Sequence, residues 1–181
     1  MKTLPSVFFS LDSPVPAQQR GAIGEAWETL GPSLAKATAV LVASAHWQTK
    51  VPMLAGSVRA PRSLDIAQRA RNLLGAAGLV AGIDGRRGLE EAPWRRVLHG
   101  YPKVDMPLAQ LSVQPALGPA HHVAMGQALR ALSEEGVLIV GSGGIADAAF
   151  LPFFVALGAA PAGARPERIA GIESLDAYLF H

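Results

Sequence analysis

Four short apolar runs, rich in β-branched and aromatic residues, constrain the fold of this chain more than any other feature. They cover residues 7–10, 39–45, 106–113 and 137–140. Runs of this length with few polar residues are typical of strands that are buried on both faces of a sheet. We therefore expect a sheet with cover on each side.

Segments with the apolar spacing of amphipathic helices separate these predicted strands. Ser63 is a candidate N-cap for the second of these helices. The third begins after Pro119 and ends at Gly136. The expected apolar faces comprise Ile23, Trp27, Leu30 and Leu34, then Ile66, Ala70, Leu73 and Ala77, then Met125, Leu129 and Leu132, and finally Phe150, Phe154 and Leu157.

The order of these elements predicts the architecture. Alternating strands and helices favour a three-layer α/β/α domain with a mainly parallel or mixed central sheet. A loop rich in Pro, Ala and Gly follows at residues 159–166, and the tail at 169–180 is apolar enough to dock on the domain. A chain of 181 residues has the size of one domain, so we expect a single domain over residues 1–181.

Composition excludes several classes of protein. Apolar residues make up 50% of the chain and charged residues 17%, which fits a compact domain that forms a homo-oligomer or binds a partner subunit. The net charge of +2 is scattered along the chain, so we expect no binding to nucleic acid or membranes. Without cysteines, a metal site would need His, Asp or Glu. The N-terminus does not have the pattern of a signal sequence, and no apolar stretch approaches about 20 residues, so a cytoplasmic location is expected.

The residues that follow the predicted strands are the first candidates for a site, because open α/β sheets bind ligands at the carboxyl ends of their strands. His46 follows the second strand and is the best single candidate, although a lone histidine is more frequently a hydrogen-bonded structural residue than a ligand. Asp12 follows the first strand and could be a metal ligand or a general base, or part of an Asp-Ser-Pro turn. Both alternatives stay open for each residue.

Three further groups have a functional and a structural interpretation. Residues 141–144, Gly-Ser-Gly-Gly, could present backbone N–H groups to an anion or form a tight turn between a strand and a helix. His121 and His122 are adjacent on a predicted helix and point about 100° apart, so we expect solvated or packing residues rather than a chelating pair. Glu90 and Glu91 could supply acid–base chemistry, but neighbouring carboxylates in a polar loop are usually solvated.

Six short motifs follow one another along most of the chain. They are FSLDSP at 9–14, SAHW at 44–47, RGLEEAPW at 87–94, YPKVDMPLAQLS at 101–112, EEGVLIVGSG at 134–143 and FLPFFVALGA at 150–159. In this order they resemble the DOPA-dioxygenase type of the class III extradiol ring-cleavage dioxygenases, the LigB superfamily. Members of that family hold a divalent metal through histidines in four of these motifs, iron for catalysis and zinc in some preparations.

The resemblance implies that most of the metal ligands have been lost. His46 is the one retained histidine, whereas Leu11, Asp147 and Ala149 stand at the other three ligand positions. Glu91 stands at the position of the family's acid–base histidine. Two segments of the family are also missing, one after the second strand and one between Gly-Ser-Gly and Phe-Leu-Pro. No metal cofactor is therefore expected.

On this basis the chain is expected to be a degenerate homologue of the extradiol ring-opening dioxygenases, without the usual non-haem iron activity. It would bind a small aromatic or acidic molecule or act as a partner subunit. The alternative is an active dioxygenase, or a related oxidoreductase, with Fe(II) or Zn(II) in a rebuilt site. Asp12, His46 and Asp147 would form that site, because one histidine and two carboxylates can bind a divalent ion.

Overall fold

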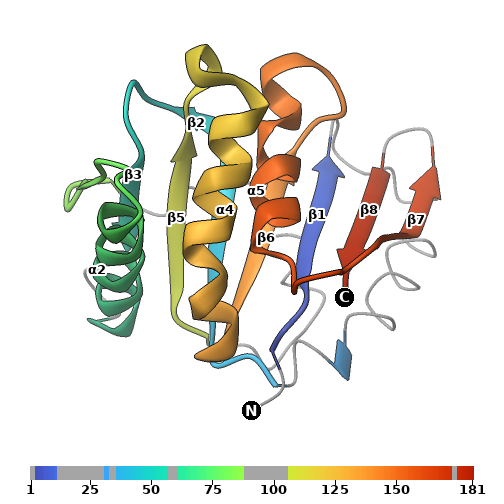
Figure 1. Cartoon of the computed structure of the whole chain (residues 1–181), viewed down its shortest axis with the longest axis horizontal. Helices are drawn as coiled ribbons and strands as arrows, with labels where there is room; N and C mark the ends of the chain where they lie inside the picture. The colour runs from blue at the N-terminus through green and yellow to red at the C-terminus, as the bar shows by residue number, and fades with distance from the viewer. Residues whose placement is uncertain (1–2, 12–30, 33–35, 57–60, 88–105, 173–174) are drawn as a thin grey trace.

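The computed structural model describes residues 3–11, 31–32, 36–56, 61–87, 106–172 and 175–181. In this part of the chain, eight strands form one sheet and the helices pack against it (Figure 1). None of the helices in these ranges combines the length and the apolar character that crossing a bilayer requires.

The sheet is mixed and has four parallel strands at its centre. Its strands are β1 (Ser6–Leu11), β2 (Ala39–Gln48), β3 (Met53–Gly56), β4 (Gly82–Ile83), β5 (Leu108–Val113), β6 (Val137–Gly143), β7 (Pro166–Ile172) and β8 (Leu175–Phe180). They lie in the order β4-β3-β5-β2-β6-β1-β8-β7. The central strands β5, β2, β6 and β1 run in parallel, while β3 is antiparallel to β5 and β8 is antiparallel to both β1 and β7. The prediction of an α/β fold with a mixed sheet is confirmed.

Three helices cover one face of this sheet, and Figure 1 shows them side by side in front of it. They are α2 (Pro61–Ala76), α4 (Gly118–Glu134) and α5 (Leu151–Ala159), and two short 3-10 helices, η2 (Pro115–Leu117) and η3 (Asp147–Phe150), precede α4 and α5. Leu41 of β2, Leu111 of β5 and Ile139 of β6 belong to the same buried cluster as Met125 and Leu129 of α4. These contacts form the main core.

The opposite face of the central strands is buried as well. Successive residues of a strand point to opposite faces, so Val40 and Val42 of β2 point away from the core that contains Leu41. Both valines are 0% exposed, and Leu138 of β6 is 1% exposed. The central strands are therefore covered on both faces, as their apolar sequences predict and as a three-layer arrangement requires.

The four predicted strands are confirmed as β1, β2, β5 and β6, with shifted ends. β2 and β6 extend beyond their predicted ends, to Gln48 and Gly143, and β5 begins at Leu108. The apolar pattern does not reveal the other four strands, because β3 and β4 have only 4 and 2 residues and β7 carries charged residues. The tail, predicted only to dock, forms together with residues 166–168 the hairpin β7–β8 that extends the sheet beside β1.

The helix predictions hold in outline and differ in detail. α4 agrees with the prediction, and Gly136 follows it with φ of 85°. α2 begins at Pro61, so Ser63 lies in its first turn and is not its N-cap. The Oγ of Ser63 instead accepts a hydrogen bond from the backbone N–H of Leu108 (3.0 Å) and joins α2 to β5. The first predicted helix, around Trp27, lies outside the described residues.

The buried face of α5 differs from the predicted one. Phe150 belongs to η3, and Phe154 and Leu157 are only half-buried. Val155 and Ala156 are 0% exposed instead, because α5 packs against α4 as well as against the sheet. A helix held between two neighbours buries a wider face than its hydrophobic spacing alone indicates.

Two glycines allow α4 and α5 to approach each other closely. A Cβ atom on Gly126 would overlap the carbonyl oxygen of Val155, and one on Gly158 would overlap the carbonyl oxygen of Val123. The Arg130 guanidinium donates a hydrogen bond to the carbonyl oxygen of Gly158 (3.0 Å), which also joins the two helices. The two backbones can lie this close only because both positions lack a side chain.

Candidate functional site

The carboxyl ends of the four parallel strands lie at one edge of the sheet, the upper edge in Figure 1. The register places Ser10 of β1 beside Gly143 of β6, and β2 pairs with the other side of β6. Leu11 at the end of β1 and His46 near the end of β2 therefore lie at the same edge as the segment that follows Gly143. We call this the carboxyl edge.

His46 lies inside β2 rather than directly after it, because the strand continues to Gln48. Its side chain is exposed, and within the described residues its ring has no hydrogen-bond partner. The neighbouring Trp47 is buried, and the guanidinium carbon of Arg87 lies 4.4 Å from the centre of its ring. A cation over an indole face is attracted by the ring electrons. In the Ser-Ala-His-Trp motif, His46 thus presents an exposed imidazole, and Trp47 is buried beneath Arg87.

The 3-10 helix η3 brings positions 147 and 149 to the carboxyl edge. The backbone N–H of Gly144 donates a hydrogen bond to the carbonyl oxygen of Ala149 (2.9 Å). A Cβ atom on Gly143 would overlap that same oxygen and lie 3.2 Å from the Cβ of Ala45, so η3 packs beside the end of β2. Asp147 is exposed and has φ of 50°, a left-handed conformation that Asp adopts more readily than most residues.

The Gly-Ser-Gly-Gly segment at 141–144 serves close packing. A Cβ atom on Gly141 would overlap the carbonyl oxygen of Pro152 in α5. β6 continues through Gly143, residues 144–146 separate it from η3, and the N–H of Gly144 is already hydrogen-bonded. The geometry therefore does not support an anion site at a helix N-terminus.

The two adjacent histidines are packing residues, as expected, and both contact Gln114 through different atoms. His122 is fully buried, accepts a hydrogen bond at Nε2 from the backbone N–H of Gln114 (3.0 Å) and donates from Nδ1 to the carbonyl oxygen of Gly118 (2.7 Å). These partners define the neutral tautomer. Burial lowers the pKa of His122, and the hydrogen bond to Gly118 opposes part of that effect. Burial also lowers the pKa of the half-buried His121, whose Nε2 lies 3.2 Å from Oε1 of Gln114.

Gln114, which contacts both histidines, also belongs to a polar network that the sequence patterns do not predict. Its Nε2 lies 3.0 Å from Oγ of Ser112 and 3.2 Å from Oγ1 of Thr49. Ser112 Oγ also accepts a hydrogen bond from the backbone N–H of Met53 (2.9 Å). The network ties the ends of β2 and β5 to β3 and α4. A Ser and a Gln at the end of an apolar run are the only sequence signal for it.

Three serines lie side by side across β5, β2 and β6, just below the carboxyl edge. Ser112 and Ser142 flank Ser44 in the register, and each serine is at most 1% exposed. In the described part of the chain, the Oγ of Ser44 has no hydrogen-bond partner. A buried hydroxyl group without a partner is costly, because it has lost its contact with water.

We expect Ser44→Ala to leave the free energy of unfolding unchanged or to raise it by about 1 kcal/mol, because it removes an unsatisfied buried hydroxyl group. Urea denaturation at neutral pH measures this change. Ser112→Ala is the matched control, since its hydroxyl group has several partners and its removal should cost about 1–3 kcal/mol. Equal losses in both variants would contradict the assignment.

In the part of the chain that the structure describes, few side chains at the carboxyl edge carry donor atoms for a metal ion. Among the described residues, no group of three His, Cys, Asp or Glu side chains could hold a metal ion. The edge offers the imidazole of His46 and the carboxylate of Asp147, whereas leucine at position 11 and alanine at position 149 have no side-chain donor. Asp12 and Glu91 lie outside the described residues, and their roles stay predictions.

Several known proteins that share one name are similar to this chain in sequence. The protein named 4,5-DOPA dioxygenase extradiol from Mirabilis jalapa is 35% identical over 129 residues, which are 60% of this chain and 48% of that protein. The one from Beta vulgaris is 37% identical, also over 60% of this chain and 48% of its own length. The one from Escherichia coli K12 is 29% identical over 163 residues, 78% of this chain and 59% of that protein. The chain thus spans about half the length of the plant relatives it matches.

A solved structure supports the fold. The crystal structure of the uncharacterized protein JW3007 from Escherichia coli K12 superposes with a TM-score of 0.75 and covers 98% of both chains, at 22% sequence identity. Identity this low shows a shared fold and nothing about function. No protein-family profile matches the chain.

Proposed function

This chain is related to the 4,5-DOPA extradiol dioxygenases, and from that kinship we propose that it is a degenerate homologue without their usual iron-dependent activity. In this proposal it binds a small aromatic or acidic molecule at the carboxyl edge or acts as a partner subunit. One observation supports the proposal. The positions that the resemblance assigns to the family's metal ligands, namely 11, 46, 147 and 149, lie at the carboxyl edge, and leucine at 11 and alanine at 149 have no donor atom.

The chemistry of ring opening explains why this loss matters. Extradiol cleavage needs a metal with open positions, where catecholate and dioxygen bind side by side, and a nearby acid–base group. An exposed His46 alone would hold ferrous iron weakly, and neither leucine nor alanine can coordinate it. The residues present do not fit the four-histidine centre that the resemblance implies. We therefore propose no cofactor for this chain.

An active enzyme with a rebuilt site is the second candidate. It would hold Fe(II) or Zn(II) through Asp12, His46 and Asp147. The observation that favours it is that His46 and Asp147 are both exposed at the carboxyl edge, and that Asp147 keeps an uncommon backbone conformation. Such conformations cluster at functional sites.

Metal retention and oxygen uptake distinguish the two candidates. We expect the purified chain, incubated with Fe(II) without oxygen and then desalted, to keep much less than one equivalent of iron, because its donors are too few. We also expect no oxygen uptake with catechols. Iron analysis and an oxygen electrode provide the two measurements. Stoichiometric iron together with catechol turnover would overturn the first proposal.

Asp147→Asn is the matched variant for this experiment. Asparagine tolerates the φ of 50° as aspartate does, so the substitution removes the carboxylate without adding backbone strain. If the chain is degenerate, its iron content should equal that of the parent. A drop in retained iron in Asp147→Asn would support the rebuilt site.

Assembly with a second copy of the chain is part of the partner-subunit proposal. The most exposed large apolar side chains among the described residues all lie at the same end of the sheet as His46. They are Val51 (46%), Val80 (78%), Leu117 (50%) and Ile145 (55%). Apolar side chains that gather around one edge favour contact with another surface. A homo-oligomer and a cytoplasmic location remain proposals.

A further inference from the structure

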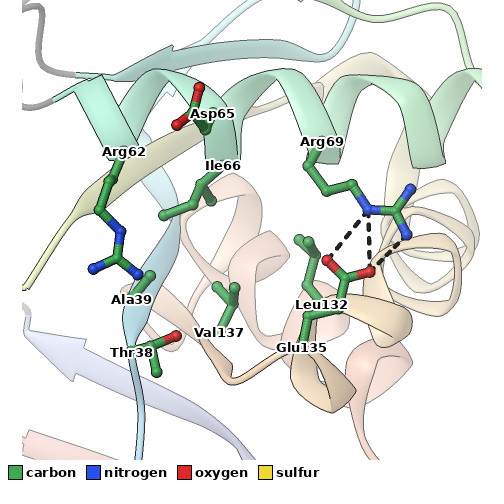
Figure 2. Close-up of a pocket in the computed structure, with 9 residues that line it drawn as sticks. All are labelled: Thr38, Ala39, Arg62, Asp65, Ile66, Arg69, Leu132, Glu135 and Val137. Carbon is green, nitrogen blue, oxygen red and sulfur yellow. Dashed lines mark hydrogen bonds and ion pairs between the residues drawn. The ribbon is translucent and has the colours of Figure 1, made fainter.

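A cleft lies at the opposite edge of the sheet from His46. It is an open cleft of about 240 Å³ between α2 and the C-terminal end of α4, at the amino ends of β2 and β6 (Figure 2). Its lining residues are Thr38, Ala39, Arg62, Asp65, Ile66, Arg69, Leu132, Glu135 and Val137. The volume is below the roughly 300–1,000 Å³ of sites for drug-sized ligands, so it suits a molecule about the size of a single ring.

The floor of the cleft is apolar. Ala39 is 2% exposed, Leu132 is 1% exposed and Val137 is 5% exposed, and the half-buried Ile66 continues this surface from α2. Apolar atoms that line a hollow without filling it favour contact with an apolar ligand, because that contact removes more surface from water. The floor would therefore hold the apolar part of a ligand.

An ion pair forms one wall of the cleft, so that wall has no net charge. Arg69 of α2 and Glu135, just after α4, form a bidentate pair with N–O distances of 2.6 to 3.2 Å (Figure 2). The guanidinium and the carboxylate satisfy each other, so neither presents a free charge to a ligand. This pair closes one end of the cleft.

The remaining cation faces the floor. Arg62 has no ion pair within the described residues, and Figure 2 shows its guanidinium extending over Ala39 and Thr38. Asp65, which also lines the cleft, lies three residues further along α2, and its carboxylate points away from Arg62 and from the floor in the same view. The charge that is free to meet a ligand over the apolar floor is thus positive.

We propose that this cleft binds a small organic carboxylate with an apolar body. The Arg62 guanidinium donates hydrogen bonds to the carboxylate, because its planar donors match that group. The apolar body lies on Ala39, Ile66 and Val137. This site goes beyond the proposed function and does not depend on it, because it shares no residue with the carboxyl edge.

Titration of the full-length chain with benzoate, followed by heteronuclear NMR, tests this proposal. We expect weak, saturable shifts at the backbone signals of residues that line the cleft. Benzamide, which lacks the charge, and acetate, which lacks the ring, should each bind less tightly than benzoate. Equal affinity for benzoate and benzamide would overturn the proposal, since it would show that no cation takes part.

Two variants of α2 make the test specific. Arg62→Gln should weaken benzoate binding about fivefold. The variant loses one charge-assisted hydrogen bond to the carboxylate, and exposure of Arg62 to water limits the strength of that bond. Arg71→Gln is the matched control, because Arg71 is exposed on the same helix and lies nine residues away, about 180° around the axis. It should bind benzoate as the parent does. If both variants bind equally well, the carboxylate is not held by Arg62 and the proposal fails.

Discussion

Gly126→Ala is expected to destabilise the chain by about 3 kcal/mol, at the upper end of the range for overpacked cores. The added methyl group would overlap the carbonyl oxygen of Val155 and lie 2.7 Å from the backbone nitrogen of Ala159 and 2.8 Å from the Cα of Gly158. All three atoms belong to the backbone of α5, which cannot rotate aside as a side chain can. Helix α5 would have to move away from α4. For a chain of this size the melting temperature should fall by roughly 6–12 °C.

Gly75→Ala is the control for this prediction. Gly75 lies on the exposed side of α2, and a Cβ atom placed there would meet nothing within 4 Å. Because alanine favours a helix more than glycine does, this variant should be more stable by about 0.5–1 kcal/mol. Thermal denaturation followed by circular dichroism measures both variants. A Gly126→Ala protein as stable as its parent would show that α4 and α5 do not approach as closely as described.

His122→Ala is the second substitution with a large expected effect, a loss of about 3 kcal/mol. It removes a buried ring and leaves the N–H of Gln114 and the carbonyl of Gly118 without their side-chain partner. His121→Ala is the matched control, because the neighbouring ring is only half-buried and has one side-chain hydrogen bond, to Gln114, in addition to its edge contact with His122. It should cost about 1 kcal/mol. Urea denaturation at neutral pH compares them, and a larger loss in His121→Ala would contradict the assignment.

The same histidine should make stability depend on pH. Above the unfolded-state pKa of about 6.5, His122 is neutral in both states and does not affect the pH dependence. Burial lowers its pKa in the folded state, so below about 6.5 the unfolded chain binds a proton that the folded chain does not. The free energy of unfolding should therefore fall as the pH falls, until the lower folded pKa is reached. His121 contributes in the same direction.

The fall in the free energy of unfolding with decreasing pH should be shallower in His122→Ala than in the parent chain, because the variant has lost a group whose pKa is lower in the folded state. Chemical denaturation at a series of pH values between neutral and mildly acidic conditions provides the test. Identical slopes in the two proteins would show that the buried imidazole does not titrate differently on folding.

The sequence by itself determined the centre of the sheet and the identity of the side chains at its carboxyl edge. The apolar runs of β1, β2, β5 and β6 predict buried strands, because a run with few polar residues is stable only when both faces are covered. Side-chain identity alone shows that leucine and alanine at positions 11 and 149 cannot bind a metal. Coordination depends on atom type, which a sequence states directly.

Only the tertiary structure decided which residues lie together and how deeply each is buried. Strand β8 pairs with β1, a partner distant in sequence, and the edge strand β7 pairs with β8, so their own residues carry little signal. The exposure of His46 and the burial of His122 depend likewise on how distant segments pack. Gly126 has no sequence signature of its role either, because the atom that excludes a side chain belongs to another helix. Such contacts arise between segments, and no local pattern encodes them.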